Sequence, residues 1–319
     1  MATFLSSALA VVALLEAPPS ASQAPGSPVT GDSLAALRAR AARDSTDAQL
    51  WLLTGRAYYE LGTEAHGATH RGPEDSAWTR GVLDTAEEAL VRAAGLAGSS
   101  AVGDSARVLR VGAWVARSWL AWESAGIEAG QVALGPLPTD LRVPAVLEEL
   151  GENLLRACPT GGVLFTADMA DSYAAWYMRF ARELRPDLIV LPLSVWRSDA
   201  VLRRRLAADL KLGRRAGDDG LAELARRRPV CVSMAFDRPP PRLKWEARPL
   251  EWVAGAQGRS ARVPPRDFVF AALRVALDQH DPWAEPALAA YTRAARITRT
   301  LCEPLATFKV TSEVASCRS

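Results

Sequence analysis

The sequence predicts a mixed α/β protein in which an α-helical amino-terminal region precedes a small α/β domain with a parallel sheet. The first observation is an apolar periodicity of helical type through much of the amino-terminal half. The second is a strand–loop–helix–strand unit at 161–193, which places two parallel strands side by side with a crossover helix on one face. We therefore expect a leader and linker at 1–31, helices at 32–142 and the α/β domain, with carboxy-terminal helices, at 143–319.

The amino terminus has the features of an export signal. Phe4–Leu15 is an apolar run with the length of a signal-peptide core, and small residues suited to cleavage follow at Pro18–Ala21. The run is shorter than the roughly 20 residues that a spanning helix needs. We expect a periplasmic protein, or one at the extracytoplasmic face of the membrane, with the segment either cleaved near Ser22 or retained as an anchor.

The helical region resembles a tetratricopeptide repeat at Trp51–Tyr58. This segment follows the pattern W-x-x-L-G-x-x-Y with Thr54 at the Leu position, and Ala86–Ala93 fits the second helix of the repeat. Gly55 would let the neighbouring helix approach closely. The resemblance implies a helix layer that presents one face to a protein partner. The aromatic residues that we expect either to contact this partner or only to pack between helices are Trp51, Tyr58, Trp114, Trp119 and Trp122.

A polar insertion at Thr63–Ser76 separates the two repeat-like helices and contains two histidines. His66 and His70 have the i, i+4 spacing that can bind zinc on a helix. Gly67 and Gly72 instead predict a loop, which would not hold the pair rigidly. We therefore predict no metal site here.

Apolar periodicity and turn residues predict the remaining elements. Further helices are expected at Ser105–Ser124 and Val143–Cys158. The expected elements of the α/β domain after the latter are strands at Val163–Thr166, Leu188–Ser194, Val230–Phe236 and Leu250–Ala254, and helices at Pro265–Gln279 and Pro286–Leu301.

The loop after the first predicted strand is the candidate ligand site. Ligands of such sheets bind beyond the carboxyl ends of the strands, and Asp168, Asp171 and Tyr173 occupy that position. Alternatively, Asp171 only caps the next helix by accepting the amide of Tyr173 or Ala174. The loop lacks glycine, so it does not predict a phosphate-binding nest, and no cofactor is expected.

The same segment resembles the soluble carboxy-terminal domain of a bacterial membrane protein family of unknown function, related to protein O-mannosyltransferases. The family run F-T-N-G-D-N-D-T-Y-P-L-W-Y-L-Q, followed by R-P-D, is matched by Phe165, Thr166, Asp171, Ser172, Tyr173, Trp176, Tyr177, Arg185, Pro186 and Asp187. Ala167, Asp168 and Met169 depart from it. The resemblance implies a detached Rossmann-like domain without the transmembrane region that would carry transferase chemistry.

Four cysteines lack metal-ligand spacing, and export would place them in an oxidising compartment. We predict a disulfide between Cys302 and Cys317, which would tie down the carboxy-terminal tail. A Cys158–Cys231 bridge is a second possibility, although Cys231 also fits a buried apolar position in a strand.

Composition and motifs favour a binding role over catalysis. The net charge of +2 predicts no nucleic-acid partner, and no Ser/His/Asp arrangement is suggested by any motif. We expect a non-catalytic interaction or scaffold subunit docked on a membrane protein complex, with peripheral membrane association. The alternative is a glycan- or lipid-glycan-handling protein that uses Asp168 and Asp171.

Overall fold

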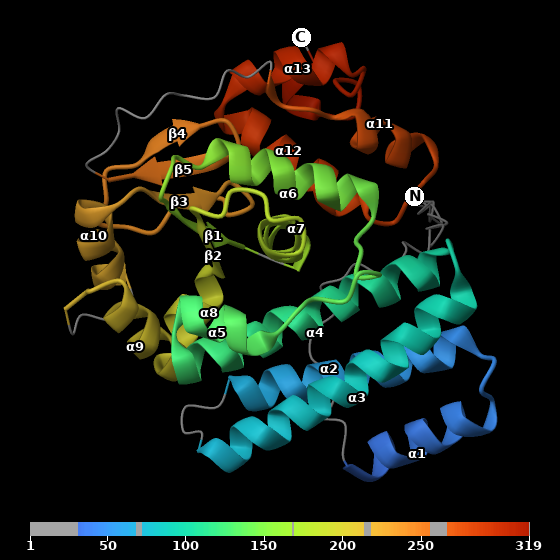
Figure 1. The fold of residues 1–319 in the computed structure, drawn as a ribbon. Helices are drawn as coiled ribbons and strands as arrows, with labels where there is room; N and C mark the ends of the chain where they lie inside the picture. Colours follow the sequence, from blue (N-terminus) through green and yellow to red (C-terminus); the bar gives the residue numbers. More distant parts are fainter. Residues whose placement is uncertain (1–30, 68–71, 168, 214–217, 256–266, 319) are drawn as a thin grey trace, which may run out of the picture.

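The computed structural model describes residues 31–67, 72–167, 169–213, 218–255 and 267–318. It confirms a mixed α/β fold, with helices that precede and surround one small sheet (Figure 1). The predicted signal segment lies outside the described residues. In the described part, no helix has the length and apolar character needed to cross a membrane. The first four helices form what we call the helix layer: α1 (Gly31–Arg43), α2 (Ala48–His66), α3 (Pro73–Ala97) and α4 (Ala101–Ala125).

Local capping signals set where these helices start. The Asp47 side chain accepts the amide of Leu50 at 3.0 Å and begins α2. Ser100 caps α4 in the same manner through the amide of Gly103. The predicted insertion is shorter than expected, because α2 continues to His66 and α3 already begins at Pro73. His66 is therefore a helical residue rather than a loop residue.

Two glycines on α2 allow α3 to approach closely. A Cβ on Gly55 would lie 2.6 Å from Leu90 Cγ, and one on Gly62 would lie 2.7 Å from Leu83 Cδ2. Both leucines are fully buried. The close approach expected at Gly55 is therefore present, and any side chain there would have to displace a core residue of α3.

The sheet has five strands in the order β2-β1-β3-β5-β4. The strands are β1 (Val163–Thr166), β2 (Ile189–Pro192), β3 (Val230–Ser233), β4 (Glu246–Arg248) and β5 (Glu251–Ala254). β1 pairs in parallel with β2 and β3, whereas β5 is antiparallel to both β3 and β4. The expectation of a parallel sheet is thus corrected to a mixed one. A short turn joins β4 to β5, and such a connection can pair only antiparallel strands.

Alternate residues of the central strands face two separate cores. Leu164, Val190 and Cys231 pack with α6 (Ala145–Ala157), α7 (Met169–Phe180) and α12 (Ala284–Ile297). The intervening residues, such as Phe165 and Val232, pack with α8 (Leu193–Ser198), α9 (Ala200–Asp209) and α10 (Asp218–Arg227). Successive crossovers therefore cover opposite faces of β1, and the sheet is buried on both sides.

Helix α4 joins the helix layer to the α/β domain (Figure 1). Its Trp122 is fully buried in the core that contains Phe165. Trp176 of α7 donates from its indole Nε1 to Ser118 Oγ at 3.2 Å. Helix α5 (Ile127–Leu134) then leads toward α6. Because α4 completes a core beneath the sheet, it is a structural part of both regions.

The carboxy-terminal part covers α6 and ends in a disulfide loop. It comprises α11 (Ala271–Asp278), α12, η2 (Arg299–Leu301), α13 (Cys302–Thr307) and η3 (Ala315–Cys317). The start predicted for the first of these helices, at Pro265, lies outside the described residues. Both cysteine pairs are bonded, Cys302 to Cys317 and Cys158 to Cys231. This confirms the predicted carboxy-terminal bridge and decides the second possibility in favour of pairing.

Candidate functional site

The loop after β1 is organised around a buried carboxylate. Asp171 is 1% exposed, and its two oxygens accept the amide of Ala167 at 3.1 and 2.9 Å. α7 begins at Met169, so Asp171 lies in the first turn and bonds an upstream amide. The hydrogen bond of Asp171 therefore differs from the predicted one. We expected Asp171 to accept the amide of Tyr173 or Ala174, which would require the helix to begin later in the chain. Asp168 lies outside the described residues.

Tyr173, the third residue of the candidate ligand site, connects α7 to the helix layer. Its hydroxyl contacts the hydroxyl of Tyr59 on α2, and its side chain is 5% exposed. Burial raises the pKa of Tyr59 to about 12 and holds the pKa of Tyr173 well above its usual value. The ring crosses α4 at Gly112, where a Cβ would lie 2.8 Å from Tyr173 Cζ. Tyr173 is thus an internal contact, and the structure does not present it to a ligand.

The tryptophans of α4 also face inward. Trp122 is fully buried, so of the two roles expected for it the structure places it in packing. Trp119 packs against the ring of His66 with centroids 5.7 Å apart. Trp114 donates its indole Nε1 to Glu87 at 2.8 Å. On α2, Trp51 and Tyr58 remain partly exposed.

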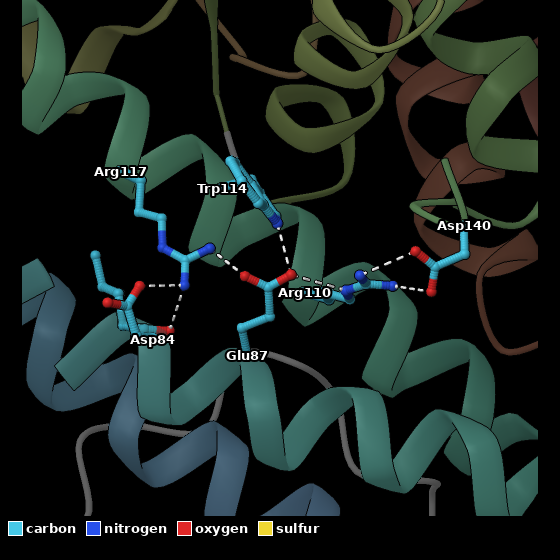
Figure 2. A network of polar contacts seen from close by, with 7 residues as sticks. Asp84, Glu87, Arg110, Trp114, Arg117 and Asp140 are labelled. Atoms are coloured by element: carbon cyan, nitrogen blue, oxygen red, sulfur yellow. Dashed lines mark hydrogen bonds and ion pairs between the residues drawn. The ribbon is translucent and has the colours of Figure 1, made fainter. Parts of the chain in front are cut away.

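A network of charged side chains joins α3 to α4 (Figure 2). Glu87 accepts from Nε of Arg110 at 3.1 Å and from Nη1 of Arg117, in addition to Trp114. Arg110 also binds both oxygens of Asp140 at 2.7 and 3.1 Å. Burial alone would lower the pKa of Arg110, but its hydrogen bonds with Asp140 and Glu87 outweigh burial and raise it. The guanidinium group of Arg110 is therefore held as a cation between Glu87 and Asp140.

Two hollows lie beside this network on the helix layer. The first, of about 430 Å³, lies between α1, α2 and α3. Its lining residues are Arg38, Ala42, Ser45, Trp51, Thr54, Thr85, Glu88, Ala89 and Arg92. The second hollow, of about 450 Å³, is lined by Asp84, Glu87, Glu88, Val91 and Arg117. Glu88 belongs to both linings, so the two hollows are neighbours along α3.

The first hollow combines an aromatic wall with exposed cations. Trp51 donates its indole N–H to the carbonyl of Ser45 at 3.2 Å, which fixes the ring at the edge of the hollow. Arg38 and Arg92 are exposed there. Glu88 is the one acidic residue in the lining. This arrangement suits a partner segment that carries carboxylates and an apolar side chain.

Two buried carboxyl groups lie on the α6 side of the sheet. Burial raises the pKa of Glu149 to about 7, although its oxygens accept the amides of Ala272 and Leu273 at 2.7 and 3.0 Å. Burial likewise holds the pKa of Glu251 well above its usual value. One oxygen of Glu251 lies within 4.8 Å of both sulfurs of the Cys158–Cys231 bridge. Both groups are enclosed in the core, so neither is presented to a ligand from solvent.

Sequence reasoning also missed a buried cluster of one histidine and two carboxylates at the end of α2. His66 lies between Glu123 of α4 and Asp199, which caps α9. These residues come from three separated elements, so no sequence spacing could indicate the cluster.

Comparisons of the chain with protein-family models, with curated protein sequences and with solved structures each found no match.

Proposed function

We propose that the protein is a non-catalytic interaction subunit that binds a partner through the first hollow of the helix layer. The observation that carries this proposal is the hollow of about 430 Å³ between α1, α2 and α3, with Arg38, Arg92 and the ring of Trp51 at its surface. An open, charged depression with one aromatic wall suits a peptide segment better than a small substrate. Small-molecule sites enclose their ligands more completely.

The partner that fits is an acidic segment of a membrane-associated protein on the extracytoplasmic side. Exposed arginines favour carboxylates, and a tetratricopeptide-like layer uses its concave face for such segments. The two disulfides support an oxidising, extracytoplasmic compartment. Peripheral association with the membrane would then follow from docking on the complex.

The alternative, a glycan-handling protein, gains no support from the described part of the loop after β1. Asp171 is enclosed and bonds the backbone, and Tyr173 is directed at Tyr59. Neither is presented to a ligand. We therefore propose the interaction role alone.

Charge reversal at the first hollow tests the proposal. The variant R38E/R92E should lose co-purification with its partner from detergent-solubilised membranes, because acidic groups would then face like charges. The matched control, R56E/R80E, changes the same charges at exposed positions of α2 and α3 outside both hollows. Equal recovery of the same partner with both variants would contradict the proposal.

A further inference from the structure

A buried carboxyl group lies beside the Cys158–Cys231 bridge. Glu251 is the first residue of β5 and is fully buried. Within the described residues, neither of its oxygens has a hydrogen-bond partner. One of these oxygens lies within 4.8 Å of both sulfur atoms of the bridge. A buried polar group that makes no hydrogen bond is costly and rare in native proteins, so Glu251 requires an explanation other than packing.

The sheet holds Glu251 and Cys231 together, whereas Cys158 comes from a different element. β3 and β5 pair as an antiparallel ladder in which Ser233 lies opposite Glu251. Cys231 precedes Ser233 by two residues, so it shares a face of the sheet with Glu251 and is its diagonal neighbour. Cys158 instead lies at the end of α6. Before the bridge closes, the sheet alone therefore keeps the Cys231 thiol next to the carboxyl group.

The surroundings of Glu251 suit a group that gains and loses a proton. Burial raises the pKa of its carboxyl group well above the usual value, and the charges of Arg185, after α7, and Arg248, on β4, act in the opposite direction. Arg185 also donates to the carbonyl of Cys158 at 3.0 Å, which places its charge beside the bridge. Burial thus favours the neutral acid, while two cations stabilise the anion. A raised pKa is also closer to that of a thiol, ordinarily about 8.5, so a proton passes more easily between the two groups.

We propose that Glu251 carries the proton when the Cys158–Cys231 bond forms. Thiolates are the nucleophiles in this chemistry, and an external disulfide is the oxidant. The carboxylate of Glu251 takes the proton of the Cys231 thiol, and the Cys231 thiolate attacks the external disulfide and expels one thiolate. Cys158 then loses its proton to solvent, attacks the Cys231 sulfur of the mixed disulfide and expels the second thiolate.

The two cysteines thereby lose two electrons, and the external disulfide becomes two thiolates that solvent protonates. Glu251 keeps the proton that it accepted. This explains why an unpaired carboxyl group is tolerated beside the finished bridge, because it is neutral there. Both cysteines are enclosed in that bridge, so the reaction precedes the final packing of the end of α6 on the sheet.

The second bridge provides a comparison within the same chain. Among the described residues, no carboxylate oxygen lies within 4.8 Å of both sulfurs of the Cys302–Cys317 bridge. Its formation should therefore depend on ionisation of the thiols by solvent alone. The inference is also independent of the proposed partner site, because neither the buried bridge nor Glu251 lines either hollow.

Reoxidation of the reduced full chain by glutathione disulfide tests the proposal, with rapid alkylation and mass spectrometry to follow each bridge separately. E251Q preserves the shape of the side chain without its proton acceptor. At about pH 6 it should slow closure of Cys158–Cys231 about 100-fold, as expected for loss of a general base. Closure of Cys302–Cys317 in the same molecules should keep its rate. The control E152Q alters a carboxylate on α6 that is 37% exposed and should leave both rates unchanged.

Equal rates of Cys158–Cys231 closure in wild type and E251Q would overturn the proposal. Equal slowing of both bridges would also overturn it, since that result would indicate delayed folding. The pH profile gives a second readout. In E251Q the rate should rise about tenfold per pH unit up to the ordinary thiol pKa of about 8.5, because the thiol must ionise by itself.

The wild-type rate should level off at a lower pH, where Glu251 has ionised, and E251D should restore part of this behaviour. Parallel pH profiles in wild type and E251Q would show that Glu251 does not carry the proton.

Discussion

The two sides of α4 are held by different physical chemistry. Toward α3, buried apolar residues such as Leu83 and Leu120 are joined by a charged network, in which Glu87 accepts from Arg110 and Arg117 at once (Figure 2). Toward the α/β domain, contact is apolar and aromatic, and includes the fully buried Trp122 and the ring of Tyr173 that crosses Gly112. The charged network of the first contact is partly open to water, since Asp140 and Asp84 are exposed, whereas the second contact is closed.

This difference fits the distribution of surface features. Both hollows lie in the helix layer, and Glu87 and Arg117 of the charged network line the second of them. An apolar contact exposed to water would favour aggregation, whereas ion pairs can be exposed to water without that effect. The α/β side instead gains its stability from burial and from the Cys158–Cys231 bridge. We infer that the helix layer is shaped for exposure and the α/β domain for rigidity.

Removing the buried disulfide should cause the largest loss of stability. The Cys158–Cys231 bridge closes 73 residues and the Cys302–Cys317 bridge closes 15. Loop entropy predicts a loss of about 4 kcal/mol for C158A/C231A and about 3 kcal/mol for C302A/C317A. Urea unfolding of both double variants measures the difference. A larger loss from the carboxy-terminal pair would show that the α/β domain does not depend on its bridge as we suggest.

Removing the central carboxylate of the network should have the next largest effect. In E87Q, Arg110 and Arg117 lose their shared anionic partner while their side chains stay 8% and 10% exposed. Because Arg110 keeps Asp140 and Arg117 keeps Asp84, the unfolding free energy should fall by at most about 3 kcal/mol, the cost of removing one partner of a buried ion pair. The control D140N alters a carboxylate that is 68% exposed and should cost much less. Equal losses of unfolding free energy in E87Q and D140N, measured by chemical denaturation, would mean that the buried Glu87 stabilises the protein no more than the exposed Asp140.

Some of this architecture could be predicted from sequence. The bounds of β1 follow from a short apolar run between a Gly-Gly turn and small or acidic residues, so Val163–Thr166 was predicted without error. β4 was not predicted, because Glu246–Arg248 is short and has no alternating apolar pattern. The antiparallel pairing of β5 with both β3 and β4 makes the sheet mixed, and no local signal carries that information.

The candidate sites show the same limit. The position of Asp171 near a helix start predicted that this carboxylate caps α7. The amide that it accepts depends on where the helix begins, and a sequence gives that position only to within a few residues. The inward orientation of Trp122 followed from the packing of α4 under the sheet, which is a long-range contact. The spacing of aromatic residues along one helix does not indicate whether they form a partner-binding surface or part of the core.

Stability should fall as pH rises from about 5 to about 8, because of Glu149. Its pKa is about 7 in the folded protein against an ordinary value of 4.5. Between these values the folded state binds more protons than the unfolded state, so the unfolding free energy declines, by at most about 3 kcal/mol. E149Q should flatten this decline, and the exposed control E303Q should not. An unchanged slope in E149Q would place the titrating group elsewhere, with Glu251 as the next candidate.

The smallest effect, about 2 kcal/mol, is expected from G112A, which tests the closed side of α4. The new methyl group would lie 2.8 Å from Tyr173 Cζ and 2.9 Å from its hydroxyl oxygen. The ring cannot easily yield, because it is buried and its hydroxyl contacts Tyr59.

The control G81A lies within α3, where a Cβ meets nothing within 4 Å. It should stabilise the protein by about 0.5–1 kcal/mol, since alanine favours the helix. A double-mutant cycle with Y173L then isolates the contact. If the ring is the obstacle, G112A should cost at least about 0.5 kcal/mol less in the Y173L background. Additive losses would show that G112A acts on α4 alone, and that Tyr173 does not set the distance between the two regions.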